Sequence, residues 1–201
     1  MTNMAILISG RGTNMEALAR KCKSGELKAS ISFVASDKPD ALGVDKAKAM
    51  GLKALVLPYD KGRSVGEAAL EEELIKHSVD WIVLAGFMRI LSSQFVARHS
   101  ERIVNIHPSL LPAFPGTQAI RDAFEYGVKV TGVTVHLVDE MVDHGPILNQ
   151  AEVRILDQDS LESLEAKIHE VEHNIYWRTL KDLFAGRYVR RGRRMTVEGS
   201  R

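Results

Sequence analysis

The sequence predicts an α/β fold built on a mixed, mostly parallel sheet with helices on both faces. Short apolar runs without polar alternation recur along the first half of the chain, as is typical of strands buried on both faces of a parallel sheet. Segments with apolar residues three and four positions apart separate these runs, which indicates crossover helices. Two later runs are joined by a link too short for a crossover, so a C-terminal antiparallel part is expected.

The first half of the chain alternates strand and helix four times. Strands are expected at 4–8, 31–35, 54–57, 81–85 and 103–106, with helices at 15–23, 42–50, 65–77 and 92–98. Right-handed crossovers make these strands parallel.

After residue 106 a proline-rich loop changes the pattern. A helix is expected at 119–126, antiparallel strands at 129–138 and 147–155, and a last helix at 160–184. Ser160 is the expected N-cap of that helix, and Gly186 is its C-terminal stop. We therefore expect a single Rossmann-like domain over residues 1–186. A basic tail follows over 187–201, either frayed and solvated or in contact with a phosphate or a partner.

The composition limits the classes of protein and partner. The chain has 201 residues, 45% of them hydrophobic and 26% charged, which favours one large domain and excludes disordered and fibrous classes. Its 27 Lys and Arg nearly balance its 26 Asp and Glu, so we expect neither a nucleic-acid nor a membrane partner. Cys22 is the single cysteine, and the apolar N-terminal run is too short for a signal peptide. Both features favour a cytoplasmic protein.

The first strand ends in a glycine-rich loop, S-G-R-G-T-N, over residues 9–14. Glycines let backbone N–H groups approach an anion at the positive end of the following helix, so we expect a phosphate monoester site. The loop is not a dinucleotide fingerprint, because Met15 stands where a third glycine would fall. The alternative is a tight turn with Asn14 as a helix cap.

Two further loops follow strands of the expected parallel sheet. Residues 85–91 are mostly apolar, and their apolar side chains are expected either to line a pocket for a flat ligand or to pack into the core. Asn105 and His107 are two positions apart on a strand, so their side chains leave the same face at the carboxyl edge of the sheet. This pairing favours catalysis.

A glycine-ended turn supplies Asp143, which could return to the same edge. A carboxylate beside His107 would favour the charged imidazolium and so provide an acid. Asp139 and Glu140 compete for this role, and their spacing does not decide between them. His136 and His144 are possible metal ligands, but they lack a suitable set of neighbours, so no metal is expected.

Four stretches carry a resemblance that spans essentially the whole chain. They are I-S-G-R-G-T-N at 8–14, L-A-G-F-M-R-I-L at 84–91, N-I-H-P-S-L-L-P at 105–112, and G-V-T-V-H at 132–136 with D-H-G-P at 143–146. In this order they resemble the phosphoribosylglycinamide formyltransferase family. The resemblance implies transfer of a formyl group from 10-formyltetrahydrofolate, the co-substrate, to the amine of N1-(5-phospho-D-ribosyl)glycinamide in purine biosynthesis. It also implies a phosphate-binding half over about residues 1–100 and a catalytic and folate-binding half over about 101–186.

The resemblance assigns roles by position. In the catalytic set, Asn105 would donate to the oxyanion, His107 would be the general acid and Asp143 would keep it charged. Ribonucleotide binding falls to Gly12, Thr13, Asn14 and, for the glycinamide part, Glu172. Formylfolate binding falls to Arg63, Met88, Arg89, Ile90, Leu91, Asn105, Val138, Asp139 and Asp143. Pro112 would follow a cis peptide bond, and Gln118 stands where some members have histidine.

The resemblance leaves some alternatives open. It implies a monomer or a homodimer with small-molecule substrates and no metal. The closest rivals are other enzymes that use formylfolate, namely a hydrolase and a tRNA formyltransferase, although their additional domains do not fit within 201 residues. A non-catalytic nucleotide-binding module would explain the glycine-rich loop but would leave Asn105, His107 and Asp143 without a role.

Overall fold

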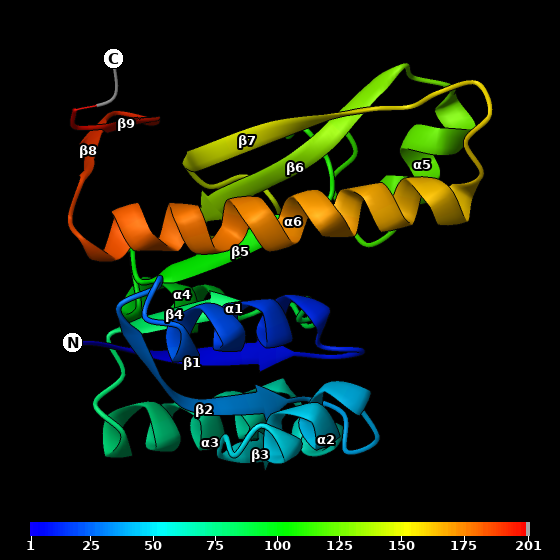
Figure 1. Cartoon of the computed structure of the whole chain (residues 1–201). Coiled ribbons are helices and arrows are strands. Elements are labelled where there is room, and N and C mark those ends of the chain that lie inside the picture. Colours follow the sequence, from blue (N-terminus) through cyan, green and yellow to red (C-terminus); the bar gives the residue numbers. More distant parts are fainter. Residues whose placement is uncertain (200–201) are drawn as a thin grey trace. The chain divides into compact units, whose positions relative to one another are not determined.

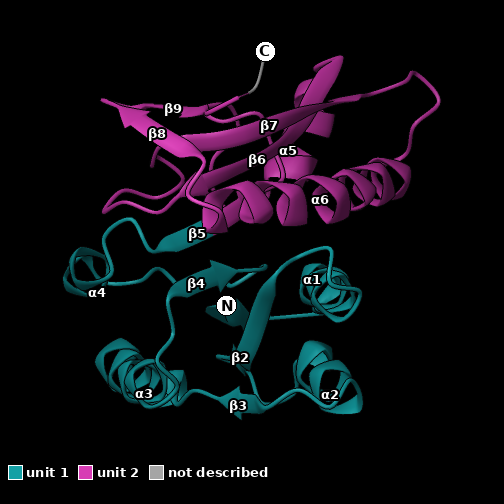
Figure 2. Cartoon of the chain, turned by 60° about the vertical axis from the view of Figure 1, so that its left-hand side comes forward, with its two compact units in different colours: residues 1–104 teal, residues 105–201 magenta. Residues whose placement is uncertain are grey.

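The computed structural model describes residues 1–199 (Figure 1). It contains two compact units, one over residues 1–104 and one that starts at residue 105 (Figure 2). No helix in the described part of the chain is long and apolar enough to cross a membrane.

The first unit contains the predicted parallel strands and their crossover helices. Its elements are β1 (Thr2–Ile8), α1 (Thr13–Lys23), β2 (Ala29–Ser36), α2 (Leu42–Ala49), β3 (Ala54–Val56), the 3₁₀ helix η1 (Tyr59–Lys61), α3 (Arg63–Lys76), β4 (Trp81–Leu84), α4 (Ser93–Arg98) and the start of β5 (Ile103–His107). The strands β3, β2, β1 and β4 are neighbours in this order, and their pairings are parallel. Residues 4–8 of β1 are fully buried, as the uniform apolar run predicts.

The second unit contains the antiparallel part. Its further elements are α5 (Ala119–Tyr126), β6 (Val130–Leu137), β7 (Ile147–Arg154), α6 (Leu161–Phe184), β8 (Tyr188–Arg191) and β9 (Arg194–Val197). β6 pairs antiparallel with β7, and α6 packs against both strands (Figure 1). Ser160 and Ser163 form a capping box at the start of α6, and Gly186 follows its end with φ 68°. Both helix boundaries are therefore confirmed.

The expectation of a frayed tail is wrong for residues 187–199. This segment forms an antiparallel hairpin of β8 and β9, in which Arg191 pairs with Arg194. Gly192 and Arg193 make the two-residue turn, and Gly192 has φ 63°. A glycine at the first position of such a turn supplies the positive φ that tight hairpins need. Residues 200 and 201 lie outside the described residues.

The proline-rich loop after β5 is held by one threonine on β6. The Thr134 hydroxyl donates to the Ser109 carbonyl at 2.7 Å and accepts from the Leu111 backbone N–H at 3.1 Å. It also accepts from the Gln150 side chain at 2.9 Å, and Gln150 donates to the Leu111 carbonyl at 3.0 Å. The peptide bond from Leu111 to Pro112 is cis, as the resemblance implies.

Replacing Thr134 by valine should lower the free energy of unfolding by about 2 kcal/mol or more. Valine keeps the shape but leaves the Leu111 N–H and the Ser109 carbonyl without their buried partner. Thr131→Val is the matched control on the same strand, because the buried Thr131 hydroxyl has no hydrogen-bond partner among residues 1–199. Urea denaturation of both variants tests this. Equal losses would show that the Thr134 bonds contribute nothing specific.

Candidate active site

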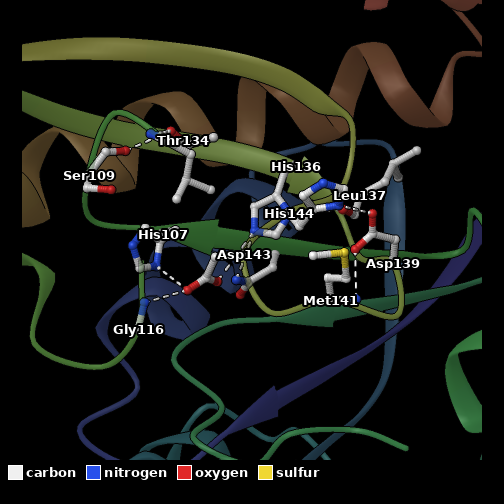
Figure 3. Close-up of polar contacts among 12 residues, drawn as sticks. His107, Ser109, Gly116, Thr134, His136, Leu137, Asp139, Met141, Asp143 and His144 are labelled. Atoms are coloured by element: carbon white, nitrogen blue, oxygen red, sulfur yellow. Dashed lines mark hydrogen bonds and ion pairs between the residues drawn. The ribbon is translucent and has the colours of Figure 1, made fainter. Parts of the chain in front are cut away.

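The structure brings His107, Asp143 and the backbone of the proline-rich loop together (Figure 3). His107 Nδ1 lies 3.5 Å from Asp143 Oδ2, and the two side chains are 5% and 10% exposed. The same carboxylate oxygen accepts a hydrogen bond from the Gly116 N–H at 2.8 Å. Asp143 is thus the carboxylate that faces the histidine, which spacing alone left undecided.

The ring of His107 is oriented from both sides. Nε2 donates to the Phe114 carbonyl at 2.8 Å, because a carbonyl can only accept. Nδ1 therefore faces the carboxylate of Asp143. A doubly protonated imidazolium satisfies both contacts, whereas the neutral ring would set a nitrogen lone pair against a carboxylate.

Asn105 contacts a second buried histidine. Its Nδ2 lies 3.2 Å from His136 Nε2, and His136 Nδ1 donates to the Leu137 carbonyl at 2.9 Å. With its proton on Nδ1, a neutral His136 accepts from Asn105 through Nε2. Burial lowers the pKa of His136, although the Leu137 carbonyl and Asp143 oppose this shift. The neutral ring thus fixes which way the Asn105 amide points.

The other two candidate carboxylates lie elsewhere in the turn. Asp139 Oδ2 contacts His144 Nδ1 at 2.7 Å, and Asp139 Oδ1 accepts from the Met141 N–H at 3.0 Å. Glu140 is exposed. The predicted Asn105, His107 and Asp143 are therefore close together, with His136 as an additional member. No group of three or more potential metal ligands occurs among residues 1–199.

The lowered pKa of His136 has a consequence for stability. Since the unfolded histidine titrates near 6.5, the unfolded chain takes up this proton before the folded chain does as pH falls. The contribution of His136 to stability is therefore complete above about pH 6.5 and is lost as pH falls through the lowered pKa. We expect the free energy of unfolding to decline less steeply below pH 6.5 in His136→Gln than in the wild type. Parallel denaturation curves from pH 7.5 to 5 test this, and identical slopes would contradict it.

In the first unit, the glycine-rich loop and the apolar loop are hydrogen-bonded to each other. The Ser9 N–H donates to the Gly86 carbonyl at 3.0 Å, and the Ser9 hydroxyl accepts from the Met88 N–H at 2.8 Å. The Ser9 hydroxyl also donates to Asp37 Oδ1 at 2.5 Å, and Arg89 Nε donates to Asp37 Oδ2 at 2.6 Å. The Asp37 side chain is 1% exposed, so this buried carboxylate fixes both loops at the ends of their strands.

The glycine-rich loop begins α1 without a side-chain cap. Gly12 is the N-cap with φ 69°, so the expected alternative with Asn14 as the cap is wrong. A Cβ on Gly12 would lie 2.7 Å from the Gly43 backbone, so both the turn and the close approach of α2 require glycine. Thr13 is half-buried and Asn14 is buried. The first N–H groups of α1 are the donors that an anion would use.

The remaining predicted binding residues are distributed over both units. In the first unit Arg63 is the exposed first residue of α3, and Met88 and Ile90 are exposed while Leu91 is buried. In the second unit Val138 and Asp139 begin the late turn. Glu172 is buried on α6, where its Oε2 lies 2.9 Å from His169 Nδ1.

Sequence reasoning missed two residues that hold the site. His136 was considered only as a metal ligand, although its position on a strand facing Asn105 gives it a different role. Asp37 is the second such residue, and its position directly after a buried strand is the sequence signal that indicates it.

Comparisons with known proteins show the family of this chain. A model described as formyl transferase matches residues 2–180. The chain belongs to the formyl transferase family. This family member is 40% identical over 185 residues to a phosphoribosylglycinamide formyltransferase of Bacillus subtilis (strain 168), which covers 91% of this chain and 95% of the relative. It superimposes on glycinamide ribonucleotide transformylase 1 from Symbiobacterium toebii with a TM-score of 0.94 and 43% identity, covering 98% and 94% of the two chains.

A solved structure with lower sequence identity carries the name of a different reaction. A formyltetrahydrofolate deformylase from Pseudomonas syringae pv. tomato has a TM-score of 0.90 and 27% identity. The alignment covers 98% of this chain but 66% of the deformylase. The solved structures confirm the predicted α/β class with its mixed, mostly parallel sheet.

Proposed function

We propose that this formyl transferase moves the formyl group of 10-formyltetrahydrofolate to the amine of N1-(5-phospho-D-ribosyl)glycinamide in purine biosynthesis. The names of relatives aligned over nearly their whole length support the acceptor and the formyl transfer. The name of the deformylase relative supports formyltetrahydrofolate as the donor. The observation that carries the chemistry is the buried contact of His107 with Asp143, beside an Asn105 amide that His136 orients.

The reaction needs charge stabilisation and one proton transfer. The substrate amine attacks the formyl carbon, and the carbonyl oxygen becomes negative in the tetrahedral intermediate. The bond from that carbon to N10 of the folate then breaks. The attacking nitrogen loses a proton and N10 takes one, so the net transfer is one proton from the amine to the leaving nitrogen. Donors aimed at the developing oxyanion and an acid near neutral pH are therefore required.

The second-unit residues fit these requirements. One N–H of the Asn105 amide is used by His136, which leaves the other for the oxyanion. Charged His107 provides a second donor and, directly or through water, the proton for N10. Asp143 keeps that ring charged, while the Phe114 carbonyl holds its other nitrogen.

Substrate binding is assigned to both units. The N–H groups at Gly12, Thr13 and Asn14 are proposed to bind the ribonucleotide phosphate, and buried Glu172 is proposed to bind the glycinamide part. Formylfolate is assigned to Arg63, residues 88–91 and the late turn, of which Val138, Asp139 and Asp143 are members. A monomer or homodimer in the cytoplasm remains our expectation.

One assay separates transfer from the hydrolysis suggested by the deformylase relative. Purified protein is incubated with 10-formyltetrahydrofolate, with and without the ribonucleotide, and tetrahydrofolate and formylated product are measured. Release of tetrahydrofolate that requires the ribonucleotide supports transfer. Equal release without it, with free formate as the product, supports hydrolysis, and absence of release in both reactions would favour a binding module.

A further inference from the structure

The C-terminal hairpin contacts the late turn through its tip residue. Arg193 lies in the two-residue turn between β8 and β9, and β9 lies beside β7 within the second unit (Figure 1). Its Nη2 donates to the His144 backbone carbonyl at 2.5 Å, and its Nη1 lies over the ring of His144, 3.0 Å from Nε2 and 3.4 Å from Nδ1. One guanidinium thus binds both the backbone and the ring of the residue that follows Asp143.

The ring of His144 also contacts Asp139, which lies near the start of the turn. Its Nδ1 lies 2.7 Å from Asp139 Oδ2, where a carboxylate can only accept. The Arg193 guanidinium contacts the face of this ring, because its Nη1 lies at similar distances from the two ring nitrogens. Asp139, His144 and Arg193 therefore form a continuous brace across the turn, with one hydrogen bond from the His144 ring to Asp139 and one from Arg193 to the His144 carbonyl.

Asp143 is the residue that this brace restrains. It has φ 50°, a left-handed conformation that costs a non-glycine residue about 1 kcal/mol or more unless its surroundings impose it. At the exit of the turn, a Cβ on Gly145 would lie 1.8 Å from the Leu137 carbonyl oxygen, so the chain there is packed tightly onto the end of β6. The Asp143 carboxylate must remain near the Gly116 N–H and His107 to act.

We infer that Arg193 is a positioning residue, which holds the late turn through His144 so that Asp143 faces His107. The inference rests on the proposed role of Asp143 in formyl transfer. It gives the basic C-terminal segment a function within the active site rather than in binding a phosphate or a partner. The residue acts through the turn and does not touch the reacting atoms.

Arg193→Met removes the donors and keeps most of the side-chain length. We expect kcat to fall about 10- to 100-fold, because small displacements of catalytic groups have effects of this size. The KM for formylfolate should rise, since the late turn is part of its proposed site, while the KM for the ribonucleotide should not change. Arg191→Met, exposed on the same hairpin, is the matched control and should retain wild-type kinetics.

Two further measurements separate positioning from general destabilisation. Hydrogen exchange in a peptide over residues 138–146 should be faster in Arg193→Met than in the wild type and in Arg191→Met. Added guanidinium ion should restore part of the kcat of Arg193→Ala and none of that of Asp143→Asn. A merely structural loss would not respond to guanidinium.

The outcomes distinguish this inference from the proposed function. Unchanged exchange together with wild-type kinetics in Arg193→Met would overturn the brace and leave the role of Asp143 intact. Faster exchange with an unchanged kcat would establish the brace and would count against the late turn as part of the catalytic site. Faster exchange with reduced kcat and guanidinium rescue would support both.

Discussion

Asp143→Asn is expected to reduce kcat by about 10²- to 10³-fold while the fold is retained. Asparagine keeps an oxygen that can accept from the Gly116 N–H, and it tolerates the positive φ of this position as aspartate does. The negative charge beside His107 Nδ1 is lost. The change therefore removes the stabilisation of the imidazolium without removing the contact that places the side chain.

Glu140→Gln is the matched control for this prediction. It removes the same charge from the same turn, but Glu140 is exposed, whereas Asp143 faces His107. Steady-state kinetics with both substrates and thermal unfolding of both variants make the comparison. An Asp143→Asn protein with wild-type kcat, or a Glu140→Gln protein with an equal loss, would remove Asp143 from the mechanism.

Much of the fold could be predicted because burial determines its sequence pattern. Residues 4–8 are fully buried, so every position is apolar and the run reads clearly as a strand. The hairpin at 188–197 lacks this signal, because its strands are short, rich in arginine and partly exposed. The one sequence signal that could have indicated the hairpin is Gly192, at the first position of its two-residue turn. The helix η1 is likewise too short to show a periodic pattern.

Site residues could be predicted where local backbone geometry sets their positions. They could not be predicted where tertiary contacts set those positions. Asn105 and His107 share a strand face, so their spacing alone placed them together. The choice of Asp143 over Asp139 depends on a positive φ in the turn and on the pairing of Asp139 with His144, and neither is visible in the spacing. The role of His136 depends on which strand lies beside Asn105.

Asn105→Ala should lower kcat by about 10²- to 10³-fold, the usual loss for one oxyanion donor, with little change in either KM. Alanine removes the amide that faces His136 Nε2 and with it the N–H assigned to the intermediate. Kinetics of the single variant test the donor role. A rise in KM at constant kcat would instead make Asn105 a ground-state binding residue.

The histidine behind Asn105 allows a sharper test of that role. His136→Phe removes the acceptor that orients the amide and should cost about tenfold in kcat, whereas His136→Gln keeps an acceptor oxygen and should recover part of it. Because His136 acts only through Asn105, the double variant Asn105→Ala/His136→Phe should be no slower than Asn105→Ala alone. Strictly multiplied losses in the double variant would show that His136 contributes to the reaction by another route, such as its 3.9 Å approach to Asp143 Oδ1.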